Sequence, residues 1–339
     1  MVAFDLFGDL DLRRSAGRVV KGSGLTALVD LAVAEAPGAV VYGASFENHP
    51  ALVARLAERH ALLGNQPGVL RAVRDPAQLG TALGGLPYPR TTVTAPSSGR
   101  WLRKPLRGGG GIGVGEWRGG ALPAGTFLQE RIDGVACSAA AVGNGRDAVV
   151  LGLTEQLVGQ RAFGVRGHRW CGNLVPPRMP SGELLDQARA TCSRLAAAFA
   201  LRGSFGVDFI WDGERAWTVE VNPRPTSSLE AIEAAYGVDV FDAHLRGCAG
   251  ELPRIEPRRS GAAGKAVLFA TEDVVVRDGP GWLERGVRDV PHPGERIAAG
   301  HPVCTVAATA ATPREALVSL EAQAARLRTE LRVEVAAGG

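Results

Sequence analysis

Residues 206–224 read GVDFIWDGERAWTVEVNPR and contain two stretches of alternating residues around a turn. The alternation in 204–211 and 216–222 predicts two β-strands joined through Asp212-Gly213. A loop at 213–215 would place Asp208 directly opposite Glu220. The same alternation puts Thr218, Glu220 and Asn222 on one face of the second strand. We therefore expect two carboxylates and an amide oxygen to converge on one point.

This group of oxygen ligands suits a hard divalent cation. Two carboxylates alone would repel each other, and Mg²⁺ prefers carboxylates together with phosphate oxygens. Asp208, Glu220 and Asn222 are therefore candidate ligands for Mg²⁺, with Mn²⁺ as an alternative ion. From the hairpin alone, a solvated polar face remains an equally good interpretation.

Two further clusters precede the hairpin. Lys104 ends a predicted strand at 101–105 and is followed by the glycine-rich run 108–113. A lysine beside such a loop can bind phosphate, because the loop N–H groups add donors. The spacing does not match a P-loop, and a flexible surface loop is the alternative. The third cluster, residues 127–134, is an apolar strand running into a polar turn, which by itself is an ordinary strand end.

Taken together and in this order, the three clusters resemble the ATP-grasp superfamily over about residues 86–250. The resemblance implies an α/β protein, α+β in its catalytic part, with three domains. Residues 1–85 would form a short Rossmann-like domain that looks truncated at its start. Residues 86–252 would form the ATP-grasp nucleotide-binding and catalytic domain, and residues 253–339 a small C-terminal α+β domain.

The resemblance also implies a role for each candidate residue. Phosphate would be bound by Lys104 and by the loop residues Gly109, Gly110 and Gly111. Adenine would be recognised by the hinge residues Gln129, Glu130, Arg131 and Ile132. The metal ligands would be Asp208, Glu220 and Asn222, and the catalytic residues would be Arg224 and Lys104. Arg224 would steady an acyl phosphate or a carboxylate. The implied cofactors are ATP and Mg²⁺.

Two positions depart from the family pattern. An acidic residue that would bind the ribose is expected four residues after Ile132, where this chain has Ala136. An upstream lysine is expected where the chain has Asp75-Pro76, so that Arg71 or Arg74 would have to replace it. Because of these two departures, the alternative is a nucleotide-binding regulatory module with impaired catalysis.

The resemblance implies an ATP- and Mg²⁺-dependent carboxylate–amine ligase that works through an acyl phosphate and releases ADP and phosphate. A phosphotransferase is a further alternative, because a metal site does not name the acceptor. The start of the chain, the segment 42–48 and the pattern 290–302 resemble uncharacterised ATP-grasp proteins linked to tetrahydromethanopterin and methanofuran one-carbon metabolism. That narrower resemblance would imply a role in cofactor biosynthesis.

A cationic segment follows the third central strand. It carries Arg161, Arg166, His168 and Arg169 between that strand and the predicted helix 184–199. Arginine forks match carboxylates, so the segment is a candidate binding site for an acidic substrate. A solvated surface loop is the alternative for each arginine.

The remaining segments predict alternating elements. Residues 1–85 show a β-α-β-α rhythm that predicts a small parallel sheet covered by helices. Ser181 is the expected N-cap of the helix 184–199. Thr312 and Glu315 predict a capping box at the start of a C-terminal helix, and residues 252–262 predict a linker.

Composition limits the partners. Hydrophobic residues make up 45% and charged residues 22% of the chain, and the net charge is +3 without any charged block. Nucleic acid is therefore not an expected partner, and no apolar run is long enough for a membrane span. The acidic start does not suit a signal peptide, and five scattered cysteines indicate free thiols. We expect a cytoplasmic protein with small-molecule carboxylate and amine substrates; a homodimer is left open.

Overall fold

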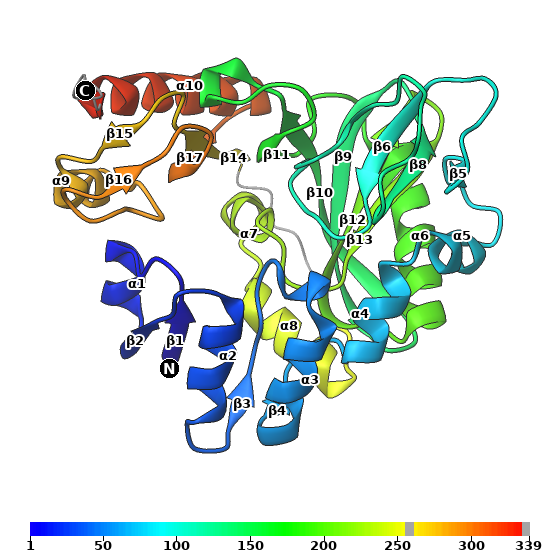
Figure 1. The fold of residues 1–339 in the computed structure, drawn as a ribbon, viewed down its shortest axis with the longest axis horizontal. Coiled ribbons are helices and arrows are strands. Elements are labelled where there is room, and N and C mark those ends of the chain that lie inside the picture. The colour runs from blue at the N-terminus through cyan, green and yellow to red at the C-terminus, as the bar shows by residue number, and fades with distance from the viewer. Residues whose placement is uncertain (255–260, 334–339) are drawn as a thin grey trace.

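The structure is a computed structural model that describes residues 1–254 and 261–333, and Figure 1 shows its ribbon. The elements in chain order are β1 (Val2–Asp5), α1 (Leu10–Ser15), β2 (Arg18–Lys21), α2 (Leu25–Val33), β3 (Ala39–Val40), η1 (Phe46–Asn48), α3 (Pro50–Arg59), β4 (Ala61–Leu62), α4 (Pro67–Val73), α5 (Pro76–Leu83), β5 (Thr91–Thr92), β6 (Trp101–Pro105), β7 (Gly115–Glu116), β8 (Thr126–Glu130), β9 (Val135–Asn144), β10 (Ala148–Val158), η2 (Arg161–Phe163), β11 (Trp170–Val175), α6 (Gly182–Phe199), β12 (Arg202–Trp211), β13 (Ala216–Asn222), α7 (Leu229–Tyr236), α8 (Val240–Ala249), β14 (Ala262–Phe269), β15 (Val274–Val275), α9 (Gly279–Glu284), β16 (Arg296–Ile297), β17 (Pro302–Ala310), α10 (Pro313–Glu330) and β18 (Arg332–Val333).

A seven-stranded sheet in the order β13-β12-β9-β10-β11-β14-β17 forms the centre of the molecule. Its neighbouring strands are antiparallel throughout. Because side chains alternate along a strand, odd-numbered residues of β9 such as Ala139 pack with α6, and even-numbered ones such as Ala140 pack with α7 and α8. The helix α6 therefore covers one face, and α7 and α8 cover part of the other.

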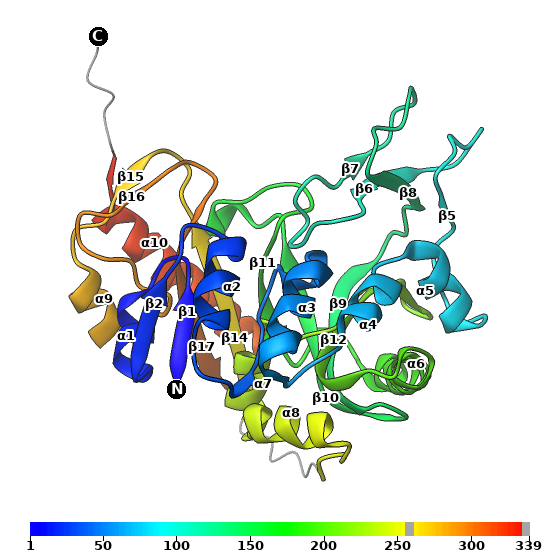
Figure 2. The same ribbon diagram turned by 60° about the horizontal axis from the view of Figure 1, so that its bottom comes forward.

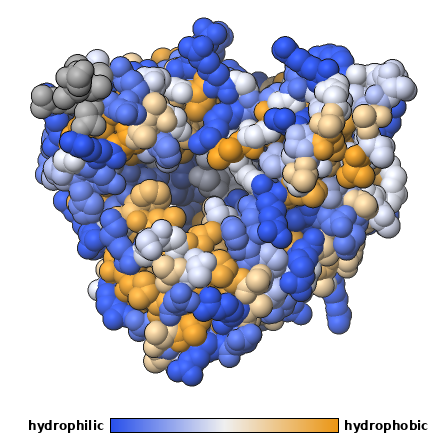
Figure 3. Space-filling view, in the orientation of Figure 1, coloured by the Kyte–Doolittle hydropathy of each residue, from blue (hydrophilic) through white to orange (hydrophobic). Residues whose placement is uncertain are grey.

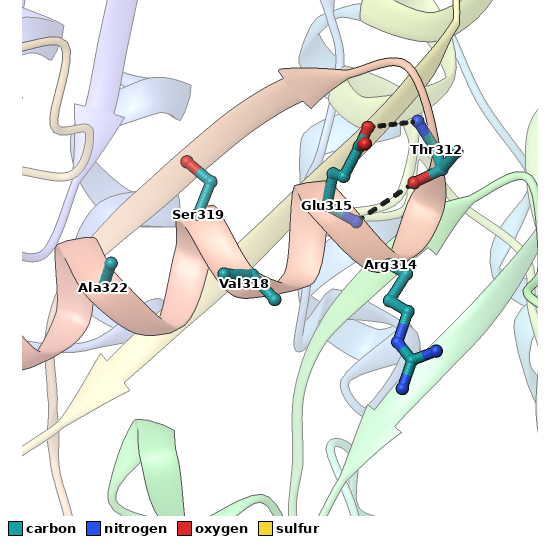
Figure 4. A pocket seen from close by; sticks show the side chains of 6 residues that line it. All are labelled: Thr312, Arg314, Glu315, Val318, Ser319 and Ala322. Carbon is teal, nitrogen blue, oxygen red and sulfur yellow. Dashed lines mark hydrogen bonds between the residues drawn. The ribbon is translucent and has the colours of Figure 1, made fainter.

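The C-terminal part continues this sheet. β14 pairs with β11 and β17 pairs with β14, while α10 packs over both strands in a common apolar core. The predicted boundary at 252/253 thus falls within one hydrogen-bonded sheet. The predicted linker lies partly outside the described residues. Thr312 and Glu315 form the predicted capping box at the start of α10, as Figure 4 shows.

The N-terminal residues form two separate parallel strand pairs, β1–β2 and β3–β4. The prediction of a single small parallel sheet is corrected in this respect, because strands of two to four residues do not join into one ladder. The helices α2 and α3 pack together on an apolar cluster around Val29 and Leu56, as predicted for an α/β unit.

A third structure, the four-stranded sheet β5-β8-β6-β7, carries the glycine-rich loop between β6 and β7. Figure 2 shows this small sheet projecting from the rest of the molecule, on the side where α5 lies. Figure 3 shows mainly hydrophilic side chains on the face seen in Figure 1, which is hollowed between the N-terminal elements and the C-terminal part. In the parts of the chain that the structure describes, there is no helix with the length and apolar character of a membrane span.

The N-terminal helix α1 is fixed to the C-terminal part by an acidic contact. Asp11 accepts hydrogen bonds from the backbone N–H groups of Asp289 and Val290, each at 3.0 Å. Asp9 lies beside them, is the N-cap of α1 and makes no side-chain capping bond. Burial, together with the charges of Asp5, Asp289 and Asp11, raises the pKa of Asp9 to about 7.

We predict that Asp9→Asn stabilises the protein increasingly as the pH rises from 5 to 8. A carboxyl whose pKa is raised on folding binds its proton more tightly in the folded state, so stability falls as the pH rises through the interval up to about 7. The substitution removes this loss, which we expect to be on the order of 1 kcal/mol at a partly exposed site. Thermal unfolding at both pH values measures it.

The matched control for this prediction is Asp11→Asn. It removes one of the two acceptor oxygens bound by Asp289 and Val290, so it should lower the melting temperature at both pH values. An Asp9→Asn variant that is less stable than the wild type at pH 8 would contradict the assignment of repulsion to Asp9.

Candidate active site

The hairpin of β12 and β13 brings the predicted carboxylates together. Asp208 pairs with Glu220 across the two strands, as the sequence predicted. The register then shifts, so that Phe209 pairs with Thr218 and Val219 is an extra residue. The prediction that Thr218 shares the face of Glu220 is therefore wrong, because this bulge turns Thr218 into the core beside Phe209, where it is fully buried.

Two of the three predicted metal ligands, Asp208 and Asn222, are hydrogen-bonded to each other. Asn222 donates through Nδ2 to Asp208 Oδ2 at 3.2 Å, and Gln156 donates to Asp208 Oδ1 at 2.9 Å. Burial and the neighbouring charge of Glu220 raise the pKa of Asp208 to about 7. Burial alone would also raise the pKa of Glu220, but Arg74 and Lys104 outweigh it and hold that pKa below its usual value.

Arg74, at the C-terminal end of α4, joins the candidate metal site to the glycine-rich loop. Its guanidinium forms an ion pair with Glu220 and donates to the carbonyl of Gly108 at 2.8 Å and to Asn48 Oδ1 at 3.2 Å. Arg71, the other candidate for the missing lysine, is exposed one turn away on α4. Of the two arginines that were candidates to replace the missing lysine, Arg74 therefore lines the cleft and Arg71 does not.

Lys104 reaches the same cluster from β6. Its ammonium donates to Gln129 Oε1 at 3.1 Å and to the carbonyl of Val219, the extra residue of the bulge, at 3.2 Å. Burial lowers the pKa of Lys104, although the carboxylates of Glu220 and Asp208 oppose this shift. The bulge therefore has a second effect, because it presents a backbone acceptor to the lysine.

The glycine-rich loop lies closely against its neighbours. Asn48 accepts from the N–H of Gly108 at 3.2 Å, and the carbonyl of Gly110 accepts from Trp170 at 3.0 Å. Gly111 has φ +74°, and a Cβ atom there would lie 1.8 Å from the carbonyl oxygen of His168. Position 111 therefore requires glycine for both its backbone conformation and this close approach.

The predicted hinge lies along the end of β8 and only part of it faces the site. Glu130, Arg131 and Ile132 line the cleft, as does Ala136. Gln129 is 2% exposed; its side-chain oxygen accepts a hydrogen bond from Lys104, and its Nε2 is buried without a hydrogen-bond partner among the described residues. The backbone N–H of Arg131 is bound to the carbonyl of Arg100 at 2.8 Å.

Only one of the four predicted substrate-binding residues lines the cleft. His168 lines the cleft, whereas Arg161 and Arg166 are exposed outside it and the guanidinium of Arg169 lies 4.9 Å from the ring centre of Phe269. Burial and the nearby charge of Arg131 lower the pKa of His168, which favours its neutral form. The expected cluster of cations at this wall is corrected, because the loop turns its arginines outward.

Arg224 connects the hairpin to the N-terminal part. Its guanidinium donates to Glu47 Oε1 at 2.9 Å, to the carbonyl of Pro225 at 3.0 Å and to Asn222 Oδ1 at 3.4 Å. Glu47, Asn48 and Gln156 were not among the predicted site residues. Glu47 and Asn48 belong to the segment 42–48, whose resemblance to other proteins gave neither side chain a role, and sequence alone cannot identify a partner 177 residues further along the chain.

One cleft of about 1510 Å³ between the N-terminal part, the small sheet and the central sheet is lined by the main candidate residues, which are Arg74, Lys104, Asp208, Glu220, Asn222 and Arg224. A second hollow, of about 480 Å³, lies along α10 beside Val318 and carries none of the candidate residues (Figure 4). Within 1–254 and 261–333, no three His, Cys, Asp or Glu side chains form a metal-binding group. The candidate metal site thus consists of two carboxylates and the amide of Asn222.

Comparison with known proteins identifies the class of this fold. Residues 78–228 match the sequence profile of the ATP-grasp domain. The chain therefore contains an ATP-grasp domain, and its mixed helix and strand architecture is the ATP-grasp fold.

Individual relatives cover different shares of the chain. The formate-dependent phosphoribosylglycinamide formyltransferase of Burkholderia pseudomallei is 33% identical over 113 residues, which are 33% of this chain and 26% of that protein. The biotin carboxylase domain of Hydrogenobacter thermophilus 2-oxoglutarate carboxylase has a TM-score of 0.71 at 16% identity, covering 98% of this chain and 85% of that one. N5-carboxyaminoimidazole ribonucleotide synthetase from Thermotoga maritima has a TM-score of 0.67 at 15% identity, covering 98% and 92%.

We predict that Arg74→Ala lowers the free energy of unfolding by about 1–3 kcal/mol, because it leaves Glu220 without its ion-pair partner in a partly buried site. The loop 108–113 should also exchange its amide hydrogens faster, since Arg74 binds the carbonyl of Gly108. Denaturant unfolding and hydrogen exchange measure the two effects. Arg71→Ala on the same helix is the control and should change the unfolding free energy by less than about 0.5 kcal/mol.

Proposed function

We propose that this chain binds ATP with Mg²⁺ and joins a carboxylate to an amine through an acyl phosphate. The observation that carries the proposal is the convergence of Lys104, Arg74 and the carboxylates of Asp208 and Glu220 beside the glycine-rich loop in one cleft. Cations beside a glycine loop suit phosphate oxygens, and the carboxylates suit the ion that phosphates bring with them.

The residues present fit Mg²⁺. Glu220 already has Arg74 as a cationic partner. Among the described residues, Asp208 is hydrogen-bonded to the amide groups of Gln156 and Asn222 and forms no ion pair, and its pKa is raised. A divalent cation at this point would offset the repulsion between the two carboxylates. When bound, Mg²⁺ would neutralise charge on the phosphate oxygens during phosphoryl transfer.

The protein's own groups would act by binding and by charge. Lys104 and Arg74 would hold the phosphates of ATP. An oxygen of the substrate carboxylate would attack the γ-phosphorus and ADP would depart, while Arg224 offsets the negative charge of that carboxylate. The amine nitrogen would then attack the acyl carbon. The C–N bond forms while the bond from that carbon to the phosphoryl oxygen breaks, phosphate leaves with the electron pair, and the amine releases a proton to solvent.

Water must be kept from an acyl phosphate during these steps. The glycine-rich loop lies against the segment 168–170 through Gly110 and Gly111, so it already covers one side of the cleft. Exclusion of water by such a loop favours aminolysis over hydrolysis. The proposed reaction requires no nucleophilic side chain of the protein.

The comparisons support the reaction class by analogy. One structural neighbour is named a synthetase, another is a biotin carboxylase domain described with MgADP and bicarbonate, and the curated relative is formate-dependent. The chain spans about a quarter of the length of that curated relative. The substrates of these relatives are therefore not assigned to this chain. A link to one-carbon cofactors stays a prediction.

We predict that ATP with Mg²⁺ raises the melting temperature of the wild type, and that Lys104→Ala and Glu220→Ala abolish most of this shift. Ligand binding to the folded state stabilises it in proportion to affinity, and these variants remove the phosphate cation and a metal ligand. Lys21→Ala and Glu58→Ala, which change exposed residues of the same types, are the matched controls. An unchanged ATP-dependent shift in both site variants would refute the site assignment.

The reaction class is tested by phosphate release from ATP across a panel of amino acids and dicarboxylates. We expect at least one pair to give amine-dependent phosphate release together with an amide product. Arg224→Ala should reduce turnover by 100-fold or more, on the order found when one group that stabilises transition-state charge is removed. Phosphorylation of a hydroxyl without an amide would instead identify a phosphotransferase.

A further inference from the structure

Glu47 has a carboxylate oxygen that the fold leaves without a partner. Its Oε1 accepts from Arg224 Nη2 at 2.9 Å, whereas Oε2 is buried and has no hydrogen-bond partner. The side chain is only 2% exposed and the residue lines the cleft. A buried charged acceptor without a donor is unfavourable, so this oxygen is suited to a ligand that supplies an N–H group.

The other carboxylates that line the cleft have partners or another role. Glu130 is paired with Arg90, Asp133 with Arg100, and Glu155 with Arg178, while Asp208 and Glu220 form the candidate metal site. Of the carboxylate oxygens that the structure describes, only Glu47 Oε2 is both buried and unpaired. Among the described carboxylates that line the cleft, Glu47 therefore has the one buried oxygen that a ligand could satisfy.

The neighbour of this atom determines what approaches it. Arg224 Nε is also buried and without a hydrogen-bond partner, so the ion pair offers one free acceptor and one free donor. Arg224 also contacts Asn222, which places the ion pair at the edge of the candidate metal site. A carboxylate would meet Arg224, and an amino group would meet Glu47.

We propose that Glu47 Oε2 binds the amino group of the second substrate and thereby positions it beside the acyl group held at Arg224. This inference rests on the proposed ligase function and names the residue that recognises the amine. Because Glu47 belongs to η1, the N-terminal part would then determine which amine the protein binds. Glu47 would be selective for amines over alcohols of similar shape, because a cationic or N–H-rich group satisfies a buried carboxylate best.

The test uses Glu47→Gln, which keeps the shape and an acceptor for Arg224 but removes the negative charge. The full-length protein is assayed with ATP, Mg²⁺ and the panel of amino acids and dicarboxylates. In parallel, hydroxylamine replaces the amine and traps the acyl phosphate as a hydroxamate without needing an amine site. Glu47→Asp is the second variant, and Glu58→Gln, an exposed change in the same part, is the control.

We expect Glu47→Gln to raise the KM for the amine about 10- to 100-fold, the range for losing a hydrogen bond to a charged group. The KM for ATP and the rate of hydroxamate formation should stay near the wild-type values. Glu47→Asp should give a smaller rise in the amine KM, and Glu58→Gln none. Thermal unfolding of each variant verifies that it is folded, and if Glu47→Gln is not, Glu47→Asp is scored in its place.

The possible failures are distinguishable. If the wild type forms neither hydroxamate nor amide with any member of the panel, the proposed function is refuted and this inference with it. If the wild type forms both products and Glu47→Gln leaves the amine KM unchanged, the inference is refuted and the ligase function stands. If hydroxamate formation falls as much as amide formation, Glu47 serves the first half-reaction or the fold, and the inference is again refuted.

Discussion

The repulsion between Asp208 and Glu220 across one strand pair is the constraint on which the candidate site depends. The β-bulge sets these carboxylates side by side, and three cations are arranged around them. Arg74 comes from α4, Lys104 from β6 and Arg224 from the end of the hairpin. The N-terminal part, the small sheet and the central sheet are therefore held together at this point by charge as well as by apolar packing.

This arrangement also explains why the N-terminal part docks where it does. Asn65 donates to the carbonyl of Pro223 at 2.9 Å and accepts from the N–H of Arg202 at 2.9 Å, so one buried amide binds both ends of the β12–β13 region. Asn48 and Arg74 together fix the first glycine of the loop. Contacts far apart in sequence thus define the geometry of the phosphate side of the cleft.

Much of this could be predicted from local pattern. The predicted pairing of Asp208 with Glu220 is found, but it arises differently from the predicted loop at 213–215: Trp211 pairs with Ala216, and the extra residue Val219 then brings Glu220 opposite Asp208. Helical spacing gave α6 to within two residues. The bulge at Val219 could not be predicted, because one extra residue leaves the alternation of the sequence unchanged. The outward orientation of Arg161 and Arg166 could not be predicted from the sequence either. The directions of side chains in a loop depend on how the loop packs against other elements, here α10 and β14. The choice between Arg71 and Arg74 needed the position of α4 relative to the hairpin.

The continuity of the central sheet into the C-terminal part has a consequence for handling the chain. A fragment that ended near residue 252, at the boundary suggested by sequence, would lack β14 and leave one edge of β11 without its hydrogen-bonding neighbour. It would also uncover the apolar side chains around Cys171 and Leu174 that now lie in the core shared with α10. An unpaired strand edge beside exposed apolar surface is a template for edge-to-edge association. Such a fragment would therefore aggregate rather than report on the isolated catalytic domain.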